Sequence, residues 1–455
     1  MIISNSKEKR QYNRNKIHLS NNKKKVFGLP LVVFGFVVFP ILFSIIISFI
    51  DRLDFYTIIV FLSIVSLFIT TGFYIPLSVY ERYFSKKVKF LDFLPPVTII
   101  VPAYNEETGI SRTIDSVFEA DYPYKEVIVV DDGSTDRTYN IASTYKNKFK
   151  NGSSFSVIHK PNGGKASAIN YALKFSKSEI VILIDADSII NKPAIKSIVK
   201  HFYDKDVIAV GGYIRVYNFS NILTNCTALE VLNAWNLIGR AFSLLGSVMI
   251  VPGALGAFRK TVILERGSYE KDTLTEDFDL TIKILKTTGK IAFEGSSLSY
   301  TDIPNNLKDL YRQRKRWYTG NFQTIIKHFN VFTNPSYEFL FKFGYPVILV
   351  LTFGRVIWSF LIPISIVLAI ISGRYIPVTI SLLIFISYSF ILSAISIIMD
   401  DQRERLRLIL YSPLMIIGYS QVLDSILIKS ILDVIFRRNL KWTRAKRTTY
   451  NNKSI

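Results

Sequence analysis

Long uncharged apolar segments flank one extended block of ordinary polarity in this sequence. Residues 26–50 and 56–80 are each 25 residues long and contain no Asp, Glu, Lys or Arg. At about 1.5 Å per residue, a helix of that length crosses a hydrocarbon layer about 30 Å thick. Two further apolar segments follow the polar block, within residues 345–399. We therefore predict a transmembrane hairpin over residues 26–80, a folded domain over 95–330 and two transmembrane helices over 345–399.

Basic residues gather at the two ends of the chain. The net charge is +21, and residues 1–25 and 437–455 contribute +7 each. Basic tails beside membrane spans indicate the cytoplasmic side and attraction to anionic lipids. We therefore predict a multi-pass protein of the plasma membrane, with the bilayer as a partner and the folded domain in the cytoplasm. Nucleic-acid binding is not favoured, because the charge flanks apolar segments and not an aromatic-rich groove.

Residues 408–436 are harder to assign than the other apolar segments. Their first part, 408–419, is apolar but too short to cross a membrane, and 420–436 is amphipathic. A single fifth span would place the basic C-terminal tail outside, against the positive-inside rule. We favour a re-entrant or surface-lying pair of helices, which keeps the tail inside, and a fifth span is the alternative.

Within the polar block, short β-branched runs alternate with helix-like segments. The runs at residues 97–101, 127–130 and 180–184 are uniformly apolar, as strands buried on both faces are. The alternation predicts an α/β domain with a mostly parallel, Rossmann-like sheet, in which ligands bind beyond the carboxyl ends of the strands. The helix-like segments cover residues 106–120, 135–149 and 165–174.

Carboxylates follow two of these predicted strands. Asp185 and Asp187 stand at i and i+2 after the run at 180–184, where they could bind a hard divalent ion together with substrate phosphates. Asp131 ends an earlier strand and could accept a hydrogen bond from a base or ribose. In the turn that follows, Gly133 is expected at positive φ, with Ser134 or Thr135 capping the next helix. Acidic pairs are common at turns, so each of these signals is weak alone.

A glycine pair opens another predicted helix. The backbone N–H groups of Gly163 and Gly164 and the ammonium of Lys165 are expected to face a diphosphate. The segment lacks the P-loop pattern, which argues against ATPase chemistry.

Glu276 and Asp277 precede a predicted helix over residues 278–286. Acidic residues at this position commonly cap a helix, and this interpretation stays open. The functional alternative makes Asp277 a general base that removes a proton from an acceptor hydroxyl while its oxygen attacks an anomeric carbon. Such a displacement inverts configuration and needs no nucleophile from the enzyme.

Gln313, Arg316 and Trp317 lie at i, i+3 and i+4, on one face of a basic amphipathic helix near residues 306–330. A helix lying on a membrane surface accounts for that pattern. The tryptophan also suits a sugar ring, and the arginine suits a diphosphate.

The ordered motifs resemble those of glycosyltransferase family 2, in particular the processive membrane synthases of cellulose, chitin, hyaluronan and poly-β-1,6-N-acetylglucosamine. The motifs are VPAYNEE (101–107), VDDGSTDRT (130–138), GGKASAIN (163–170), DAD (185–187), VPGALGAFR (251–259), TEDFDLT (275–281) and QRKRW (313–317).

This resemblance implies a role for each polar residue singled out above. It places Mg²⁺ or Mn²⁺ on the DAD motif and makes Asp277 the catalytic base. The other implied positions are Tyr104, Glu106, Asp131, Lys165 and Asp185 for the nucleotide-sugar, Asp185 and Asp187 for the metal, and Glu276, Gln313, Arg316 and Trp317 for the acceptor and diphosphate.

The resemblance also implies a UDP-sugar donor, most closely UDP-GlcNAc, and a growing polysaccharide acceptor that is exported through the protein. Two alternatives stay open: transfer of one sugar to a membrane lipid phosphate, and an inactive nucleotide-binding scaffold. An accessory subunit and a homo-oligomer are also open. Trp442 and Arg444 in the basic tail are candidates for a loop that closes over the nucleotide, or for an anchor at the membrane interface.

Overall fold

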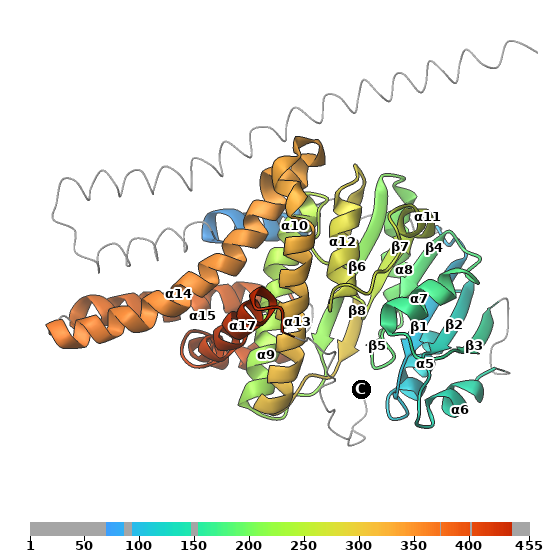
Figure 1. The fold of residues 1–455 in the computed structure, drawn as a ribbon, viewed down its shortest axis with the longest axis horizontal. Coiled ribbons are helices and arrows are strands. Elements are labelled where there is room, and N and C mark those ends of the chain that lie inside the picture. The colour runs from blue at the N-terminus through green and yellow to red at the C-terminus, as the bar shows by residue number, and fades with distance from the viewer. Residues whose placement is uncertain (1–69, 86–92, 147–152, 374, 401–402, 439–455) are drawn as a thin grey trace, which may run out of the picture. The chain divides into compact units, whose positions relative to one another are not determined.

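The computed structural model describes residues 70–85, 93–146, 153–373, 375–400 and 403–438 (Figure 1). Trp442 and Arg444, and most of the predicted hairpin over residues 26–80, lie outside these residues. The chain divides into two compact units, Met1–Pro76 with Pro363–Ser381 and Leu77–Ile362 with Leu382–Ile455. The first unit contains the π-helical turn η1, Thr70–Tyr74, and the second contains the sheet and all the predicted site residues that are described.

An eight-stranded sheet is the framework of the second unit, in the order β3-β2-β1-β4-β7-β6-β8-β5. Strands β3, β2, β1 and β4 are parallel to one another, and β1 and β4 are almost completely buried. These parallel strands confirm the predicted alternation of strand and helix. The bounds are β1 Val97–Ala103, β2 Lys125–Asp131, β3 Ser154–His159, β4 Ile180–Leu183, β5 Ile189–Ile190, β6 Val207–Val216, β7 Gly256–Arg259 and β8 Lys290–Thr301.

The prediction of a mostly parallel sheet is wrong for the other half. Strand β7 runs antiparallel to both β4 and β6, and β5 runs antiparallel to β8, so the sheet is mixed. Strands β6 and β8 are parallel, with register shifts between them. Strand β7 has the sequence GAFR, without the β-branched residues that mark β4, which explains why the pattern in the sequence did not reveal it.

Two apolar cores form, because successive side chains on a strand point to opposite faces. Ile100, Ile128 and Val130 belong to a core that also contains residues of α7 and α12. Val101 and Val127 belong to the other, with residues of α5 and α8. The helices are α5 Ile110–Glu119, α6 Thr138–Ser143, α7 Lys165–Leu173, α8 Ala194–Val199, α11 Lys260–Glu265 and α12 Glu276–Leu285, with the 3₁₀ turn η2 Lys200–Tyr203.

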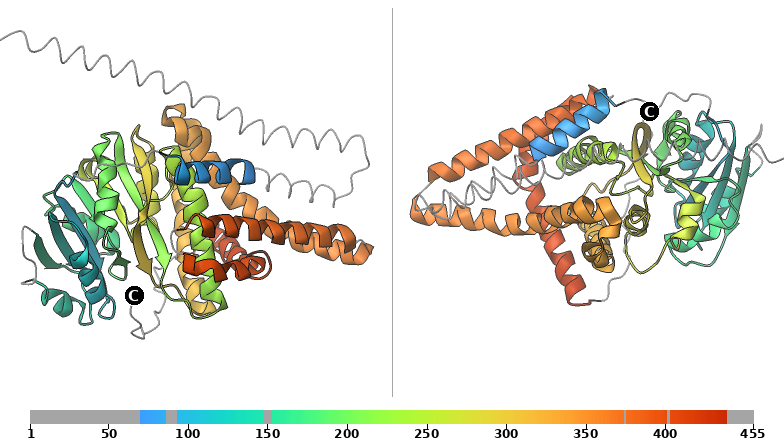
Figure 2. Two further views of the ribbon diagram at one scale, coloured as in Figure 1. Left: turned by 180° about the vertical axis from the view of Figure 1, so that it is seen from behind. Right: turned by 90° about the horizontal axis from the view of Figure 1, so that it is seen from above.

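A layer of helices lies beside the β6–β8 edge. In both views α9, α13 and α17 lie side by side (Figures 1 and 2), and ion pairs join α13 to the other two. The helix predicted near residues 306–330 is α13. The elements are α4 Ile75–Tyr83, α9 Ile222–Asn233, η3 Ala234–Gly239, α10 Arg240–Leu244, α13 Leu307–Lys327, η4 Phe329–Thr333, η5 Pro335–Tyr337, η6 Leu340–Gly344, η7 Arg403–Tyr411, α16 Ser412–Ile416 and α17 Tyr419–Ile435.

The apolar region over residues 345–399 forms two helices, α14 Tyr345–Ser372 and α15 Tyr375–Ile398. Among residues whose side chains are described, no single helix is long and apolar enough to cross a membrane. The bent pair Leu406–Ile416 and Tyr419–Ile435, with 56° between its helices, meets that length and composition together. The membrane spans therefore stay predictions.

Candidate active site

Three segments that are far apart in the sequence meet at the ammonium group of Lys165. This residue begins α7, and its Nζ lies 2.6 Å from Asp185 Oδ1 and 3.3 Å from Glu276 Oε1. Asp185 follows β4, and Glu276 is the first residue of α12. The structure therefore brings together residues that the sequence placed on separate elements. About a third of the Lys165 side chain and of the Asp185 side chain is exposed, so a ligand can reach both.

Asp277 shares the electrostatic environment of this cluster. Burial and the neighbouring charge of Glu276 raise the pKa of the Asp277 carboxyl above its ordinary value, although Lys165 opposes them. Burial and the charge of Asp187 likewise raise the pKa of Asp185 against the effect of Lys165. A carboxylate with a raised pKa is a stronger proton acceptor once it is ionised.

Lys165 stays charged in this environment. Burial alone would lower the pKa of its ammonium group, but the charges of Asp185, Glu276 and Asp277 outweigh that effect and raise it above the ordinary value. The single positive charge of Lys165 therefore neutralises only part of the negative charge of the acidic groups in this cluster. The site keeps a net negative charge.

Gly253 lets a further segment approach the Lys165–Asp185 pair. A Cβ atom at this position would lie 2.5 Å from Lys165 Nζ and 3.4 Å from Asp185 Oδ1. Any side chain here would displace the ammonium from its carboxylate. The motif VPGALGAFR around Gly253 belongs to the resemblance given above, which implied no role for this glycine, although a glycine within a motif can indicate a close approach of the backbone.

Tyr269 is a second residue that sequence reasoning missed. It is buried, and Asn170 of α7 holds its backbone, accepting from Tyr269 N at 3.0 Å and donating to Tyr269 O at 2.7 Å. Burial and the charges of Asp277 and Glu276 raise the pKa of its phenol well above the ordinary value. A protonated phenol therefore lies near the acidic cluster. Nothing in the local sequence distinguishes it from a core tyrosine.

The loop after β1 holds Tyr104 and Glu106 and is tied to the loop after β2. Asn105 adopts a φ of 55°, and its side chain accepts from Thr135 N at 2.8 Å while its own N–H donates to Ser134 Oγ at 2.9 Å. Ser134 and Thr135 therefore join two loops and do not cap α6, so that capping prediction is wrong. Gly133 has the positive φ, 75°, that was predicted.

Glu106 is 8% exposed, and its backbone N–H donates to Thr138 Oγ1 at 2.7 Å. Gly109, at the start of α5, connects it to the DAD motif. A Cβ atom on Gly109 would lie 3.7 Å from Glu106 Oε2 and 3.5 Å from Asp187 Cα. The first and fourth strands thus deliver Glu106 and the partly buried Asp187 to neighbouring positions.

Asp131 is completely buried at the end of β2. Its Oδ2 lies 2.6 Å from His159 Nδ1 at the end of β3, and its Oδ1 has no hydrogen-bond partner among the described residues. His159 was not singled out from the sequence, because the pairing of β2 with β3 is what brings it to Asp131. The predicted contact of Asp131 with a nucleotide stays a prediction.

The prediction that Gly163 and Gly164 present N–H groups to a diphosphate is wrong. The N–H of Gly164 donates to Asp132 Oδ2 at 2.7 Å, and that of Gly163 donates to the same carboxylate at 3.1 Å. Lys160 also pairs with Asp132. Asp132 directly follows β2. Its carboxylate accepts hydrogen bonds from the backbone N–H groups of Gly163 and Gly164, which were expected to face a ligand.

Helix α13 packs closely against the residues that precede α12. A Cβ atom at Gly320 would lie 2.6 Å from Thr275 N, and Leu274 N donates to Gln323 Oε1 at 3.1 Å. Gln313, Arg316, Trp317 and Gly320 recur at i, i+3, i+4 and i+7, so they share one helix face. The predicted face of α13 is therefore the one that meets the start of α12, where Asp277 lies.

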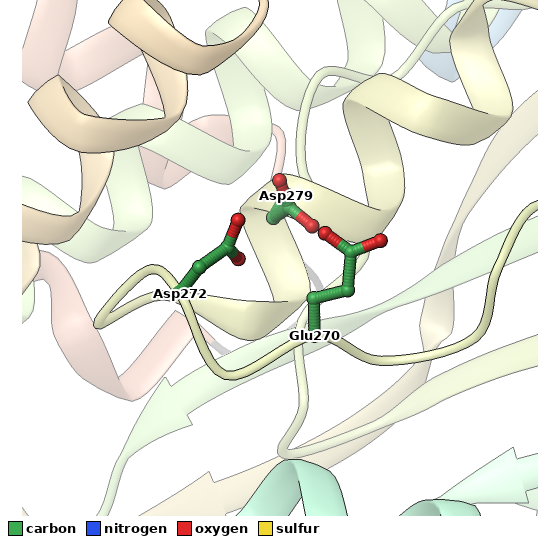
Figure 3. Close-up of side chains that lie close together, drawn as sticks. All are labelled: Glu270, Asp272 and Asp279. Atoms are coloured by element: carbon green, nitrogen blue, oxygen red, sulfur yellow. The ribbon is translucent and has the colours of Figure 1, made fainter.

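A second group of acids lies near the site and is shown in Figure 3. Oxygens of Glu270, Asp272 and Asp279 lie within 4.8 Å of one another, close enough to hold an ion. Lys327 pairs with all three, at 2.9 Å from Asp279 Oδ1 and 2.8 Å from Asp272 Oδ2. Lys283 and His328 also contact Asp279. These cations satisfy the carboxylates, so we assign the group a structural role.

Residues 98–267 match the sequence profile of glycosyl transferase family 2. The match covers less than half of the chain, so this part of the chain is similar to that family. The mixed sheet, with carboxylates beyond β4, agrees with an α/β fold of the kind that glycosyltransferases have.

The chain is also similar to poly-beta-1,6-N-acetyl-D-glucosamine synthases. It is 29% identical to that of Staphylococcus aureus strain COL over 257 residues, which is 54% of this chain and 62% of the relative. It is 30% identical to that of Staphylococcus epidermidis over 234 residues, 51% of this chain and 56% of the relative. The matched region therefore spans less than two thirds of these relatives.

A solved structure shares the fold at lower sequence identity. It is a mannosyltransferase from Pyrobaculum calidifontis in complex with GDP-Man and Mn²⁺. The similarity has a TM-score of 0.58 at 19% identity and covers 84% of this chain and 99% of that chain. It shows that the chain and this structure share their fold.

Proposed function

We propose that the protein is a processive, inverting glycosyltransferase that polymerises N-acetylglucosamine from UDP-GlcNAc into a β-linked polysaccharide. The observation that carries this proposal is the meeting of Lys165, Asp185 and Glu276 beside Asp277, in a domain similar to poly-β-1,6-GlcNAc synthases. We also propose that the product leaves through the membrane helices of the same protein.

The nucleotide would bind across the ends of β1, β2 and β4. The tied loops after β1 and β2 hold Tyr104 and Glu106 in a fixed place, and Asp131 has one carboxylate oxygen without a partner in the described part of the chain. Lys165 lies beside Asp185, where its ammonium would meet the negative charge of a diphosphate. Charge-assisted hydrogen bonds of this kind are among the stronger ones in proteins.

Asp185 and Asp187 would hold a Mg²⁺ or Mn²⁺ ion. The fit is supported by hard carboxylate oxygens that are partly exposed and by the ammonium of Lys165, a cation already 2.6 Å from Asp185. The mannosyltransferase of similar fold, solved in complex with GDP-Man and Mn²⁺, supports the same proposal. When bound, such an ion stabilises negative charge on the departing diphosphate.

Asp277 would remove the proton from the acceptor hydroxyl. As the O–H bond breaks, the oxygen forms a bond to the anomeric carbon and the bond to UDP breaks, with the electron pair leaving on the diphosphate. One displacement on the opposite side from UDP inverts an α-linked donor to a β-linked product. The raised pKa of Asp277 suits this role.

The acceptor would lie along the face of α13 that meets α12. Trp317 is half-buried there and offers an aromatic surface for the terminal sugar, while Gln313 and Arg316 lie on the same face. Oε1 of Gln313 is buried without a partner among the described residues, so a hydroxyl donor could satisfy it. Glu276 completes this side of the site through its contact with Lys165.

The test is turnover by the full-length protein in membranes, with labelled UDP-GlcNAc and Mg²⁺ or Mn²⁺. We expect an alkali-stable product of high mass, loss of activity with EDTA, and little turnover of UDP-glucose, UDP-GlcA or GDP-mannose. A chloroform-soluble product would indicate transfer to a membrane lipid instead.

The matched variant is Asp277→Asn, which preserves shape and removes the base. We expect it to lower transfer by about 10²–10⁴-fold, the usual contribution of a general base, while binding of UDP stays near that of the wild type. Asp272→Asn, in the neighbouring acidic group, is the control. Unchanged polymer formation by Asp277→Asn would contradict the mechanism and favour a scaffold role.

A further inference from the structure

One face of the Trp317 ring is covered by a charged side chain. Arg314 precedes it by one turn of α13, and its guanidinium carbon lies 4.6 Å from the centre of the Trp317 ring. The Arg314 side chain is only 6% exposed. A planar guanidinium is attracted to the negative face of an indole and stacks on it, whereas an ammonium does not stack. The contact holds one face of the ring, and Trp317 is only half-buried, so part of its side chain is accessible to a ligand.

Arg314 is itself held by two other helices. Its Nη2 lies 2.7 Å from Glu230 Oε2 on α9, and the hydroxyl of Tyr419 donates to the same oxygen at 2.6 Å. Tyr419 is buried and is the first residue of α17. Its hydroxyl also lies 3.0 Å from Thr227 Oγ1, one turn before Glu230. Arg314, Glu230 and Tyr419 therefore join the three helices that lie side by side in Figures 1 and 2.

The contacts of the guanidinium indicate what determines its orientation. Nε of Arg314 is buried and has no hydrogen-bond partner among the residues the structure describes. Its orientation therefore depends on Glu230 and on the indole. Burial alone would lower the pKa of Arg314, but Glu230 raises it above the ordinary value, so the group stays charged and the pair stays intact. Removing one member of a buried pair leaves an uncompensated charge, which is strongly unfavourable.

We propose that Arg314 is a positioning residue that orients the Trp317 ring for the acceptor sugar. Through Tyr419, this orientation also depends on how α17 packs against α9. The inference rests on the proposed role of Trp317 as the acceptor surface. Arg314 and Tyr419 act through Trp317, so their loss weakens acceptor binding and leaves donor binding and donor hydrolysis unchanged.

Two conservative variants test this. Arg314→Lys keeps a charge for Glu230 but removes the stacked plane, and Tyr419→Phe removes one hydroxyl. With a soluble β-linked N-acetylglucosamine tetramer as acceptor, we expect its KM to rise about tenfold for Arg314→Lys and about threefold for Tyr419→Phe. The KM for UDP-GlcNAc and the rate of its hydrolysis without acceptor should match the wild type.

The matched control is Arg312→Lys, the same substitution two residues earlier on α13. Arg312 pairs with Asp309, three residues before it, at 2.9 Å, and its side chain is 34% exposed. We expect wild-type values for both KM constants. A rise in acceptor KM in this control equal to that of Arg314→Lys would mean that any change of charge geometry on the helix has the effect, and would overturn the assignment.

A second readout needs no turnover. The emission of Trp317, obtained by subtracting the spectrum of Trp317→Phe, should shift in Arg314→Lys and not in Arg312→Lys. Unchanged emission together with an unchanged acceptor KM would overturn the proposal.

This readout separates the inference from the proposed function. If the wild-type protein neither binds the tetramer nor uses UDP-GlcNAc, the proposed function fails. A shift of the Trp317 emission in Arg314→Lys would still show that Arg314 positions the ring, and an unchanged emission would show that it does not. If Arg314→Lys does not elute as a folded protein in size-exclusion chromatography, Tyr419→Phe decides by the same measurements.

Discussion

Asp277 has a carboxyl pKa above the ordinary value because burial and Glu276 disfavour its charged form. The proposed base works only when it is ionised. We therefore expect kcat to fall as the pH is lowered, and to do so at a higher pH than an ordinary aspartate, with a pKa of about 3.9, would give. Initial rates across pH, with saturating UDP-GlcNAc, measure this. A kcat that stays constant down to about pH 4 would contradict it.

The residues at strand ends could be predicted because their local sequence carries the signal. Asp185 and Asp187 end an apolar run, and Glu276 and Asp277 begin a helix. The remaining members of the site depend on contacts across the fold. In the sequence, Tyr269 cannot be distinguished from a tyrosine of the core. Only the fold brings it near Glu276 and Asp277. The same applies to Asp132, His159, Gly253 and Arg314.

At the scale of elements, the packing of α13 against α12 depends on one glycine. Any side chain at Gly320 would meet the backbone of Thr275, which cannot move aside without shifting the start of α12. We expect Gly320→Val to lower kcat at least tenfold and to lower the thermal unfolding midpoint, since overpacking usually costs about 1–3 kcal/mol. Activity and differential scanning fluorimetry in detergent measure both effects. Lys308→Ala, at an exposed position of the same helix, should change neither.

The acidic group in Figure 3 holds the first turn of α12, where Asp279 lies. Burial alone would raise the pKa of Asp279, but hydrogen bonds from His328 and Lys327 and the charge of Lys283 lower it well below the ordinary value. A lowered folded-state pKa stabilises the protein above the unfolded pKa of about 3.9 and loses this effect as the pH falls. This part of the stability should therefore disappear on acidification.

Asp279→Asn should reduce the free energy of unfolding by roughly 3–5 kcal/mol near neutral pH, because it leaves buried cations without their partner. Asp272→Asn removes an acid whose side chain is 55% exposed and should cost at most about 1 kcal/mol. Denaturant titration in detergent measures both. A shift of the Asp279→Asn midpoint no larger than that of the control, or a wild-type midpoint lowered by EDTA without nucleotide, would contradict the structural assignment.

The elements differ in how well the sequence predicts them. Strands β1, β2 and β4 contain apolar, β-branched runs, and their positions agree with the predictions, as do those of α7 and α12. Strand β7 (GAFR) contains no β-branched residue and β5 has only two residues, so neither resembles a strand in the sequence. Their directions are set by the partners they meet in the sheet. The parallel half of the fold was therefore predictable, and the antiparallel pairs were not.

At the scale of the whole molecule, the basic tail beyond α17 gives a prediction. If Trp442 and Arg444 close over the nucleotide, a chain that ends after residue 438 should insert in the membrane normally and turn over UDP-GlcNAc at least tenfold more slowly, the loss expected when a closing segment is removed. Carbonate extraction measures insertion, and initial rates measure turnover. Wild-type rates in the shortened protein would leave the tail only its role as an anchor.

The wide separation of the site's parts along the chain has a consequence during translation. The four parallel strands can pair once residue 183 has left the ribosome, and Asp185, which follows two residues later, can then pair with Lys165. Glu276 and Asp277 are synthesised about ninety residues later, at roughly 5–20 residues per second. For several seconds, each nascent polypeptide can therefore hold a half-sheet without the proposed base. On the proposed mechanism, the donor site can form before the protein is able to transfer a sugar.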